Sequence, residues 1–422
     1  MVGGAARLLA GTVLAIGPLV LAPIARAEQP PLGSIQPDAY KDAPAGIKWG
    51  GLLYQASVAT GVAWDSNIFS SRENVVADRI EFIRPGLTIS TLDPNYKFTF
   101  QASLDQLIYE RETEESRTDA QGSLRGTVRL QNDTALDVAF RAARVHDSRS
   151  LQRRDIPDDA AEPVLHNDYA ASISLRRDFN PLLSTTTISY ESNDYYNVRS
   201  NAGPSINLQY LDRDMLTVTQ NTDMRLSHRL MLFSRQAIAS SVYRDVPGTE
   251  PRDSTKYTLV NGIEVGFTPL IKGRFAFHFA EESFASPIYS AEPEMIYGAD
   301  VTWSPRRNIR LSANFARDFG GINFDFDSVG GRRTRAGLGI EYDITRQLLF
   351  RASFRYQHAN EGGIIATDKR VEDTFQYKVS FGYQANRYWN LFLDYAYEAR
   401  ESRDYFSEFD RHVVQVGATA RF

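Results

Sequence analysis

Val-Gln-Val-Gly-Ala-Thr-Ala-Arg-Phe, residues 414–422, is the stretch that decides the fold. Successive side chains of a β-strand point to opposite faces, so strict alternation of apolar and polar residues predicts a strand with one apolar and one polar face. Such a strand suits a soluble β-sandwich, where the apolar face meets a core, or a membrane barrel, where it meets lipid. The alternating apolar positions are Val414, Val416, Ala418, Ala420 and Phe422.

The same alternation recurs upstream along most of the chain. One exception, Phe392, puts an aromatic ring on the polar face of its segment. Repeated period-two segments without an intervening helical pattern predict an all-β protein. The clearest segments are residues 97–105, 123–130, 274–279, 309–315, 350–357, 375–384 and 390–398.

Short connections alternate with longer polar ones. The longer stretches cover residues 147–165, 245–254, 320–332 and 359–372. This is the organisation of an outer-membrane barrel, which has tight periplasmic turns and extended outer loops. The short connections are residues 93–95, 131–133, 180–181, 268–270, 304–306, 344–346 and 385–387.

An aromatic residue stands just before several short turns, at Phe267, Trp303, Tyr342 and Tyr383. Amphipathic rings prefer the headgroup level of a bilayer, so these positions suit an interfacial girdle. A soluble sandwich has no need of the terminal Phe422 pattern, and we interpret residues 414–422 as an outer-membrane targeting signature.

Residues 53–422 are therefore predicted to form a single transmembrane antiparallel up-and-down β-barrel of about 18 strands. Sixteen strands is the main alternative, because residues 203–226 and 230–243 alternate poorly. A barrel of this size is wide enough to leave an aqueous channel. A soluble β-sandwich is the rival fold.

The N-terminal residues have a different character. Arg7, an apolar run over residues 8–24 and the closing Ala25-Arg26-Ala27 predict a cleaved signal peptide at residues 1–27. Residues 28–52, rich in Pro, Ala and Gly in their first part, are expected to be a periplasmic linker. Cysteine is absent, so no disulfide or lipid-modified cysteine is expected.

Catalytic and metal-binding patterns are weak. The six histidines lack metal-ligand spacing, and Ser283 and His278 fall on opposite faces of one predicted strand. We therefore expect no enzyme and no cofactor, and the net charge of −5 argues against nucleic acid. The Asp65-Ser66-Asn67 turn and residues 110–115 could offer oxygen ligands to a divalent cation, but a solvated outer loop is the favoured interpretation.

The charged residues on the polar faces of the strands are the candidate site. Mixed signs on neighbouring strands can form a salt-bridge lattice that stiffens the wall, and Asp105 and Asp137 belong to the same face. Alternatively, an Arg concentration at Arg310, Arg351 and Arg355 would favour anionic solutes, and Phe392 could stack on a sugar ring. The predicted pore-lining residues are Arg125, Arg129, Arg141, Glu264, Arg274, Asp300, Arg310, Glu341, Arg351, Arg355, Lys378, Asp394, Glu398 and Arg421.

The start of the barrel resembles a known family. Residues 44–51, Pro-Ala-Gly-Ile-Lys-Trp-Gly-Gly, look like its pre-barrel motif. Residues 61–69, Gly-Val-Ala-Trp-Asp-Ser-Asn-Ile-Phe, are similar to its first-hairpin signature, with Trp64 in place of the commoner Tyr. The step at residues 84–87, Arg-Pro-Gly-Leu, fits its returning strand. This is the second putative β-barrel porin family.

The resemblance implies an outer-membrane barrel, because the members of the family are such barrels, and several of them accompany exopolysaccharide or capsule secretion systems. The preferred function is thus a pore in the bacterial outer membrane for exopolysaccharide export. A stand-alone porin for small hydrophilic solutes and a closed structural or docking barrel remain alternatives. The expected partners are outer-membrane lipid and lipopolysaccharide, the barrel-assembly machinery and periplasmic polysaccharide-export components.

Overall fold

The computed structural model describes residues 46–422 apart from 94, 148, 150–159, 247–250, 288–293, 321–327, 364–369 and 404–407. The expected signal peptide, residues 1–27, and residues 28–45 of the expected linker lie outside the described residues. Among the described residues no helix is long and apolar enough to cross a membrane.

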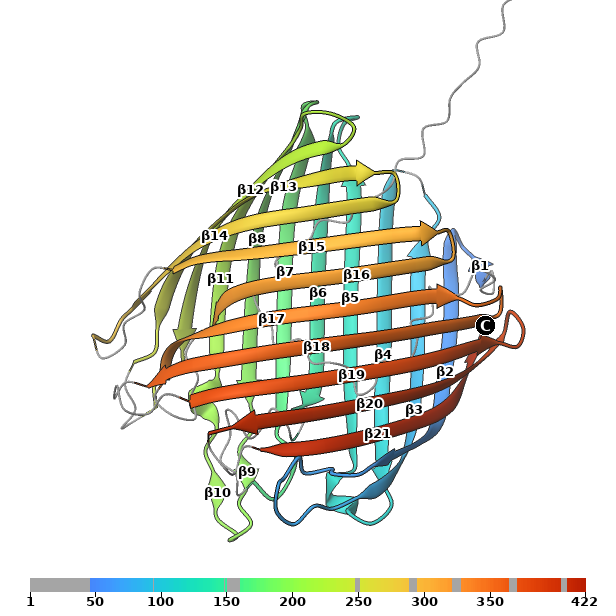
Figure 1. The fold of residues 1–422 in the computed structure, drawn as a ribbon, viewed down its shortest axis with the longest axis vertical. Coiled ribbons are helices and arrows are strands. Elements are labelled where there is room, and N and C mark those ends of the chain that lie inside the picture. Colours follow the sequence, from blue (N-terminus) through green and yellow to red (C-terminus); the bar gives the residue numbers. More distant parts are fainter. Residues whose placement is uncertain are drawn as a thin grey trace, which may run out of the picture.

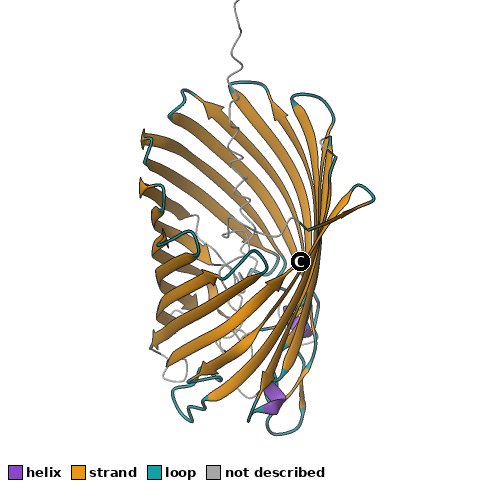
Figure 2. Ribbon diagram, turned by 90° about the vertical axis from the view of Figure 1, so that its right-hand side faces the viewer, coloured by secondary structure: helices purple, strands orange, loops and turns teal. Residues whose placement is uncertain are grey.

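Within the described residues, eighteen long antiparallel strands form one closed barrel (Figures 1 and 2). Each strand pairs with its neighbours in sequence order, and β21 pairs with β2 to close the wall. The prediction of 18 strands is confirmed, and the alternative of 16 is wrong. The strands are β2 (Leu52–Asp65), β3 (Asp78–Thr91), β4 (Tyr96–Tyr109), β5 (Arg117–Arg129), β6 (Thr134–His146), β7 (Leu165–Asp178), β8 (Leu182–Tyr195), β11 (Arg213–Arg225), β12 (Leu230–Tyr243), β13 (Ser254–Thr268), β14 (Ile271–Phe284), β15 (Glu294–Arg306), β16 (Ile309–Gly320), β17 (Ser328–Asp343), β18 (Leu348–Gly363), β19 (Arg370–Gln384), β20 (Trp389–Ser402) and β21 (Phe409–Arg421).

The two faces of the wall differ as the alternation predicts. On β21, Val414 and Val416 are exposed on one face, whereas Gln415 and Arg421 are buried on the other. The exposed face carries large apolar side chains on nearly every strand, and the opposite face carries most of the charged ones. A closed barrel in which polar groups face an enclosed interior and apolar groups face outward has the polarity of a membrane barrel.

The connections lie near the expected positions, with one difference at a short turn and one at the long loops. β15 continues to Arg306, so the turn to β16 is residues 307–308, not 304–306. The strands β16 to β19 also extend into the stretches 320–332 and 359–372 that were predicted as loops. The aromatic residues Phe267, Trp303 and Tyr383 are exposed at the short-turn end of the barrel.

Residues 196–212 explain the poor alternation noted around residue 203. This connection between β8 and β11 holds a small hairpin, β9 (Val198–Arg199) with β10 (Ser205–Ile206), and the 3-10 turn η3 (Gln209–Leu211). Val198, Leu208 and Leu211 form a small apolar cluster with Tyr195 and Val164. A second 3-10 turn, η2 (Thr113–Glu115), lies in the β4–β5 loop at the same end of the barrel.

The seam of the barrel includes a short extra strand, β1 (Ile47–Trp49), which pairs with the start of β2. Gly50 and Gly51 both have positive φ, the conformation that a two-residue hairpin turn requires. Phe422 exchanges two backbone hydrogen bonds with Ala56, at 3.2 and 2.9 Å. β1 thus continues the pairing along the edge of β2 from the point where β21 ends.

Charged inner face and infolded first loop

A ladder of two charged rows lies on the inner face of the wall, one over β13 to β15 and one over β16 to β18. Glu264 on β13 is directly opposite Arg274 on β14, which is opposite Asp300 on β15. Arg310 on β16 is opposite Glu341 on β17, which is itself opposite Arg351 on β18. Because directly opposite positions on one face bring side chains within contact distance, register alone alternates positive and negative groups along these rows.

Two arginines share one carboxylate in this ladder. Arg310 Nη1 lies 3.0 Å from Glu341 Oε2, and Arg351 Nε lies 3.9 Å from Glu341 Oε1. Arg310 is nearly two-thirds exposed, Glu341 about half and Arg351 about a third, so water screens these pairs. A single carboxylate compensates for two guanidinium groups here.

Arg355, one step further along β18, has an amide as its partner. Arg355 Nη1 donates to Gln376 Oε1 at 3.4 Å, and Gln376 Nε2 donates to Glu398 Oε1 at 3.1 Å. No carboxylate lies within ion-pair distance of Arg355 among the residues that the structure describes. The inner face around Arg310, Arg351 and Arg355, hereafter the arginine patch, therefore carries an excess of positive charge.

Sequence reasoning missed two arginines near this patch, Arg333 and Arg335 on β17. They share the alternate positions of Glu341 on that strand, and Arg335 Nε donates to Gln357 Oε1 at 3.2 Å. Extending the parity of β17 backward from Glu341 would have found both. Both lie next to the stretch 320–332 that was predicted as a loop, and the parity was applied only to Glu341.

The remaining predicted residues do not join the patch. Arg125, Arg129 and Arg141 lie on β5 and β6, on the far side of the barrel from the patch. On the same strands, Asp137 accepts a hydrogen bond from Thr127 and lies 3.9 Å from Arg176 of β7. On β3 and β4, Arg84 pairs with Asp105 at 2.8 Å. The Arg176–Asp137 and Arg84–Asp105 pairs are the wall-stiffening type of contact, and among the described residues no such ion pair includes Arg125, Arg129 or Arg141.

Lys378, Asp394 and Arg421 occupy the seam side, on β19, β20 and β21. Asp394 is 1% exposed and Arg421 is 6% exposed, so both are enclosed by neighbouring side chains. The expectation that these two residues present charge to a water-filled interior is therefore corrected: close packing under the seam covers them.

The first outer loop, residues 66–77, folds back over the inner face. Asp65 and Asn67 are buried, and Ile68 is 3% exposed. The Asn67 side-chain amide donates to the Ser71 and Asp410 carbonyl oxygens at 2.7 and 2.9 Å. Arg411 Nε lies 3.0 and 2.9 Å from the two carboxylate oxygens of Asp65, which ties the loop to β21.

An apolar cluster receives the loop. Ile68 packs against Phe82 on β3, Leu107 and Tyr109 on β4 and Phe392 on β20. The rings of Phe82 and Phe392 lie 6.2 Å apart across the seam. Phe392 is 5% exposed, so the expectation that it could stack on a sugar ring is wrong: other side chains already cover its faces.

Two glycines make room for these rings. A Cβ on Gly417 would lie 2.5 Å from Phe392 Cζ, and a Cβ on Gly61 would lie 2.5 Å from Phe82 Cζ. Both positions are on the inner face beneath the rings, where only glycine leaves the space that the rings fill.

The favoured interpretation of residues 65–67 and 110–115 as solvated loops agrees with the exposure of most of residues 110–114, but it is corrected for Asp65, Asn67 and Glu115, which are buried. Asp65 is paired with Arg411, and Glu115 is buried in an ion pair with Arg149. The Arg149 guanidinium also lies 5.5 Å from the centre of the Phe69 ring, so three outer loops contact one another. Across the described part of the chain, no three His, Cys, Asp or Glu side chains gather as metal ligands.

Together these features give a polar interior with a positive patch on β16 to β18 and an infolded loop over β20, β21 and β2 to β4. The loop covers inner-face positions of β20, β21 and β2 to β4 near the long-loop end. Such an arrangement can select solutes by charge and by width.

Comparisons with known proteins agree with this fold. Residues 38–422 match the family described as Putative beta-barrel porin 2. A search of curated protein sequences finds no match.

Solved structures share the barrel at low identity. The ferric enterobactin receptor of Pseudomonas aeruginosa is 9% identical, with a TM-score of 0.52, covering 90% of this chain and 82% of its own. The siderophore receptor PirA from Acinetobacter baumannii is 7% identical, with a TM-score of 0.50, covering 90% of this chain and 81% of its own. OccAB3 from the same organism is 9% identical, with a TM-score of 0.48, covering 89% of this chain and 100% of its own. For the two receptors, at these identities, the likeness shows the fold alone.

Proposed function

Since the chain belongs to the Putative beta-barrel porin 2 family, we propose that it is an outer-membrane pore for hydrophilic anionic solutes. Its placement in the outer membrane is supported by the apolar outer face, the alternation of short turns with long loops, and the terminal Phe422. The orientation follows from the same pattern: the short turns, the start of β2 and the end of β21 lie on the periplasmic side.

The arginine patch is the observation that carries the charge preference. Arg310 and Arg351 share Glu341, and Arg355 contacts an amide instead of a carboxylate. Fixed positive charge on the wall of a water-filled path lowers the free energy of a passing anion and raises that of a cation.

Within this class, an acidic exopolysaccharide is the exported substrate that we propose. The family resemblance at residues 44–51 and 61–69 supports it, because several members accompany polysaccharide secretion systems. Carboxylates along an acidic polymer would meet the arginine patch at successive sugar units. Periplasmic export components are the partners that this reading requires.

One measurement tests the pore and its charge preference, and a second tests the exported substrate. The protein in a planar bilayer should conduct and should prefer chloride over potassium, and the triple variant R310Q/R351Q/R355Q should lose much of that preference. The variant R144Q/R177Q is the control, because it removes two guanidinium groups from the outer face of β6 and β7 and should keep the parental selectivity. An absence of conductance would sink the pore, and an unchanged selectivity in the triple variant would sink the role of the patch.

Polymer secretion tests the substrate. A strain deleted for this chain should lose extracellular polysaccharide, and complementation should restore it. Unchanged secretion, with conductance retained, would leave a stand-alone porin for small anionic solutes.

A further inference from the structure

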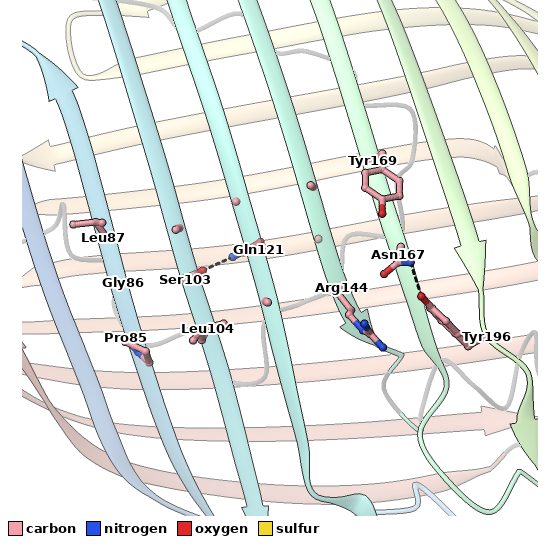
Figure 3. Close-up of a pocket in the computed structure, with 15 residues that line it drawn as sticks. Pro85, Gly86, Leu87, Ser103, Leu104, Gln121, Arg144, Asn167, Tyr169 and Tyr196 are labelled. Atoms are coloured by element: carbon pink, nitrogen blue, oxygen red, sulfur yellow. Dashed lines mark hydrogen bonds between the residues drawn. The ribbon is translucent and has the colours of Figure 1, made fainter.

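The outer face of the wall holds a groove of about 680 Å³ across β3 to β8 (Figure 3). Its floor is made of small residues in register on consecutive strands: Ala102 on β4 is opposite Gly122 on β5, which is opposite Ala142 on β6. Ala120 lies beside them in the next row, opposite Leu104. Three neighbouring strands thus lack the bulky side chains that cover the rest of the outer face.

The groove has different ends. Leu87 and Leu104 close it on the side of β3 and β4, and both are exposed apolar side chains. On the side of β6 to β8 its lining ends at Arg144, Tyr169 and Tyr196. An apolar trough therefore leads to a polar, cationic end (Figure 3).

The cationic end is arranged to receive an anion. The Arg144 guanidinium lies 5.3 Å from the centre of the Tyr196 ring, and no carboxylate of the described residues lies within ion-pair distance of it. Asn167, opposite Arg144 on β7, donates to the Tyr196 hydroxyl oxygen at 3.0 Å. That contact leaves the tyrosine O–H as a donor next to the guanidinium. Arginine forks match phosphate oxygens in geometry and charge.

The position of Arg144 along the barrel axis also matters. It is near the end of β6, at the long-loop end of the barrel, whereas the small floor residues lie further toward the middle of their strands. If the long loops face outward, as the proposed function states, Arg144 lies at the headgroup level of the outer leaflet and the groove lies at acyl-chain depth.

We propose that this groove binds a phosphorylated lipid of the outer leaflet, with an acyl chain against Ala102, Gly122 and Ala142 and a headgroup phosphate on Arg144 and Tyr196. The occupant is lipopolysaccharide, whose lipid anchor combines several acyl chains with phosphate. The inference rests on the proposed outer-membrane placement, but it does not require the interior to conduct.

The test uses the purified full chain in detergent, titrated with bisphosphorylated lipid A and followed by native mass spectrometry. The parent protein should bind one lipid A more tightly than its dephosphorylated form. R144Q should weaken lipid A binding about tenfold, the loss expected of one charge-assisted contact, and should remove the preference for phosphate. R177Q is the matched control, since Arg177 is on the same face of β7 at the opposite end.

The apolar floor is tested with A142L and, separately, G122L, which fill the groove. A Cβ on Gly122 meets only a backbone oxygen at 3.9 Å, so the strand accepts it. Each variant should lose bound lipid while keeping the heat-modifiable mobility of a folded barrel and the parental conductance. A313L, on the outer face of β16, should bind as the parent does.

Equal binding of phosphorylated and dephosphorylated lipid, or unchanged binding in A142L and G122L, would overturn the proposal. A concentration-dependent dimer that A142L disrupts would also overturn it, because a second copy would then be the occupant. Lipid binding without any conductance would instead contradict the pore and leave the groove assignment standing.

Discussion

Replacing Arg411 by methionine should release the first outer loop from the inner wall. Asp65 is fully buried, and the Arg411 guanidinium supplies its countercharge across the seam. Methionine keeps much of the length of the arginine side chain without its charge, so the variant leaves a carboxylate enclosed beside the apolar cluster of Ile68, Phe82 and Phe392.

The magnitude follows from the cost of an uncompensated buried charge. Removing one partner of a buried ion pair typically costs about 3–5 kcal/mol. The backbone N–H of Asn67, 3.0 Å from Asp65 Oδ1, recovers part of this, so we expect the lower end of the range. About 3 kcal/mol corresponds to an increase of roughly a hundredfold in the population of the undocked loop.

Limited trypsin digestion follows this population, because Arg72 is exposed in the docked loop but cleavage needs the surrounding backbone to open. A protease cuts the transiently opened state, and its rate follows the open population when closing is fast. Cleavage after Arg72 should therefore accelerate strongly in R411M. The control E73Q removes a charge from an exposed position of the same loop and should cleave at the parental rate.

The double variant D65N/R411M tests whether the lone buried carboxylate is what releases the loop. It removes both charges, so no ion is left enclosed, and most of the protection of Arg72 should return. Parental cleavage in R411M would show that the ion pair does not hold the loop. Equal cleavage in the single and double variants would show that burial of the lone carboxylate is not the cause.

Three further outcomes are expected. G61A places a methyl group against the Val416 carbonyl oxygen and 2.5 Å from Phe82 Cζ, and it should lower the free energy of unfolding by about 1–3 kcal/mol, seen as a lower denaturant midpoint in micelles; an unchanged midpoint would mean that the β21 backbone and the ring both move at no cost. E115Q leaves Arg149 without its buried countercharge and should speed proteolysis of the outer loops at no cost to barrel stability, whereas E114Q should not. F422S should lower the yield of heat-modifiable barrel in outer membranes, while F267S at a short turn should lower it less; equal yields would contradict the targeting role of the terminal residue.

Local periodicity predicted most of the fold. The parity of Val414 to Phe422 and of the similar segments upstream fixes which side chains face outward, and it needs no knowledge of distant contacts. The charged residues from Glu264 to Arg351 were predicted on the same ground, because each lies at an alternate position on the polar face of its strand.

The infolded loop could not be predicted in this way. Asp65 and Arg411 are 346 residues apart in sequence and meet only because the barrel closes. Phe392 on a polar face and the apolar pair Ile68-Phe69 within a loop were the visible signals, yet each acquires meaning only when Gly61 and Gly417 are known to lie beneath the rings. Burial of Asp394 and Arg421 has the same origin, since packing at the seam depends on closure.

Closure of the wall between β2 and β21 also governs how the molecule can be made. β2 pairs with β3 on one edge, but its other edge pairs only with β21, which is residues 409–421. Phe422 then exchanges backbone hydrogen bonds with Ala56. Until that moment the growing sheet has two unpaired edges, which invite pairing with other chains. Contacts of such long sequence separation form slowly. β21 therefore completes the cylinder, and removing residues 409–421 takes away the closing strand instead of shortening a tail.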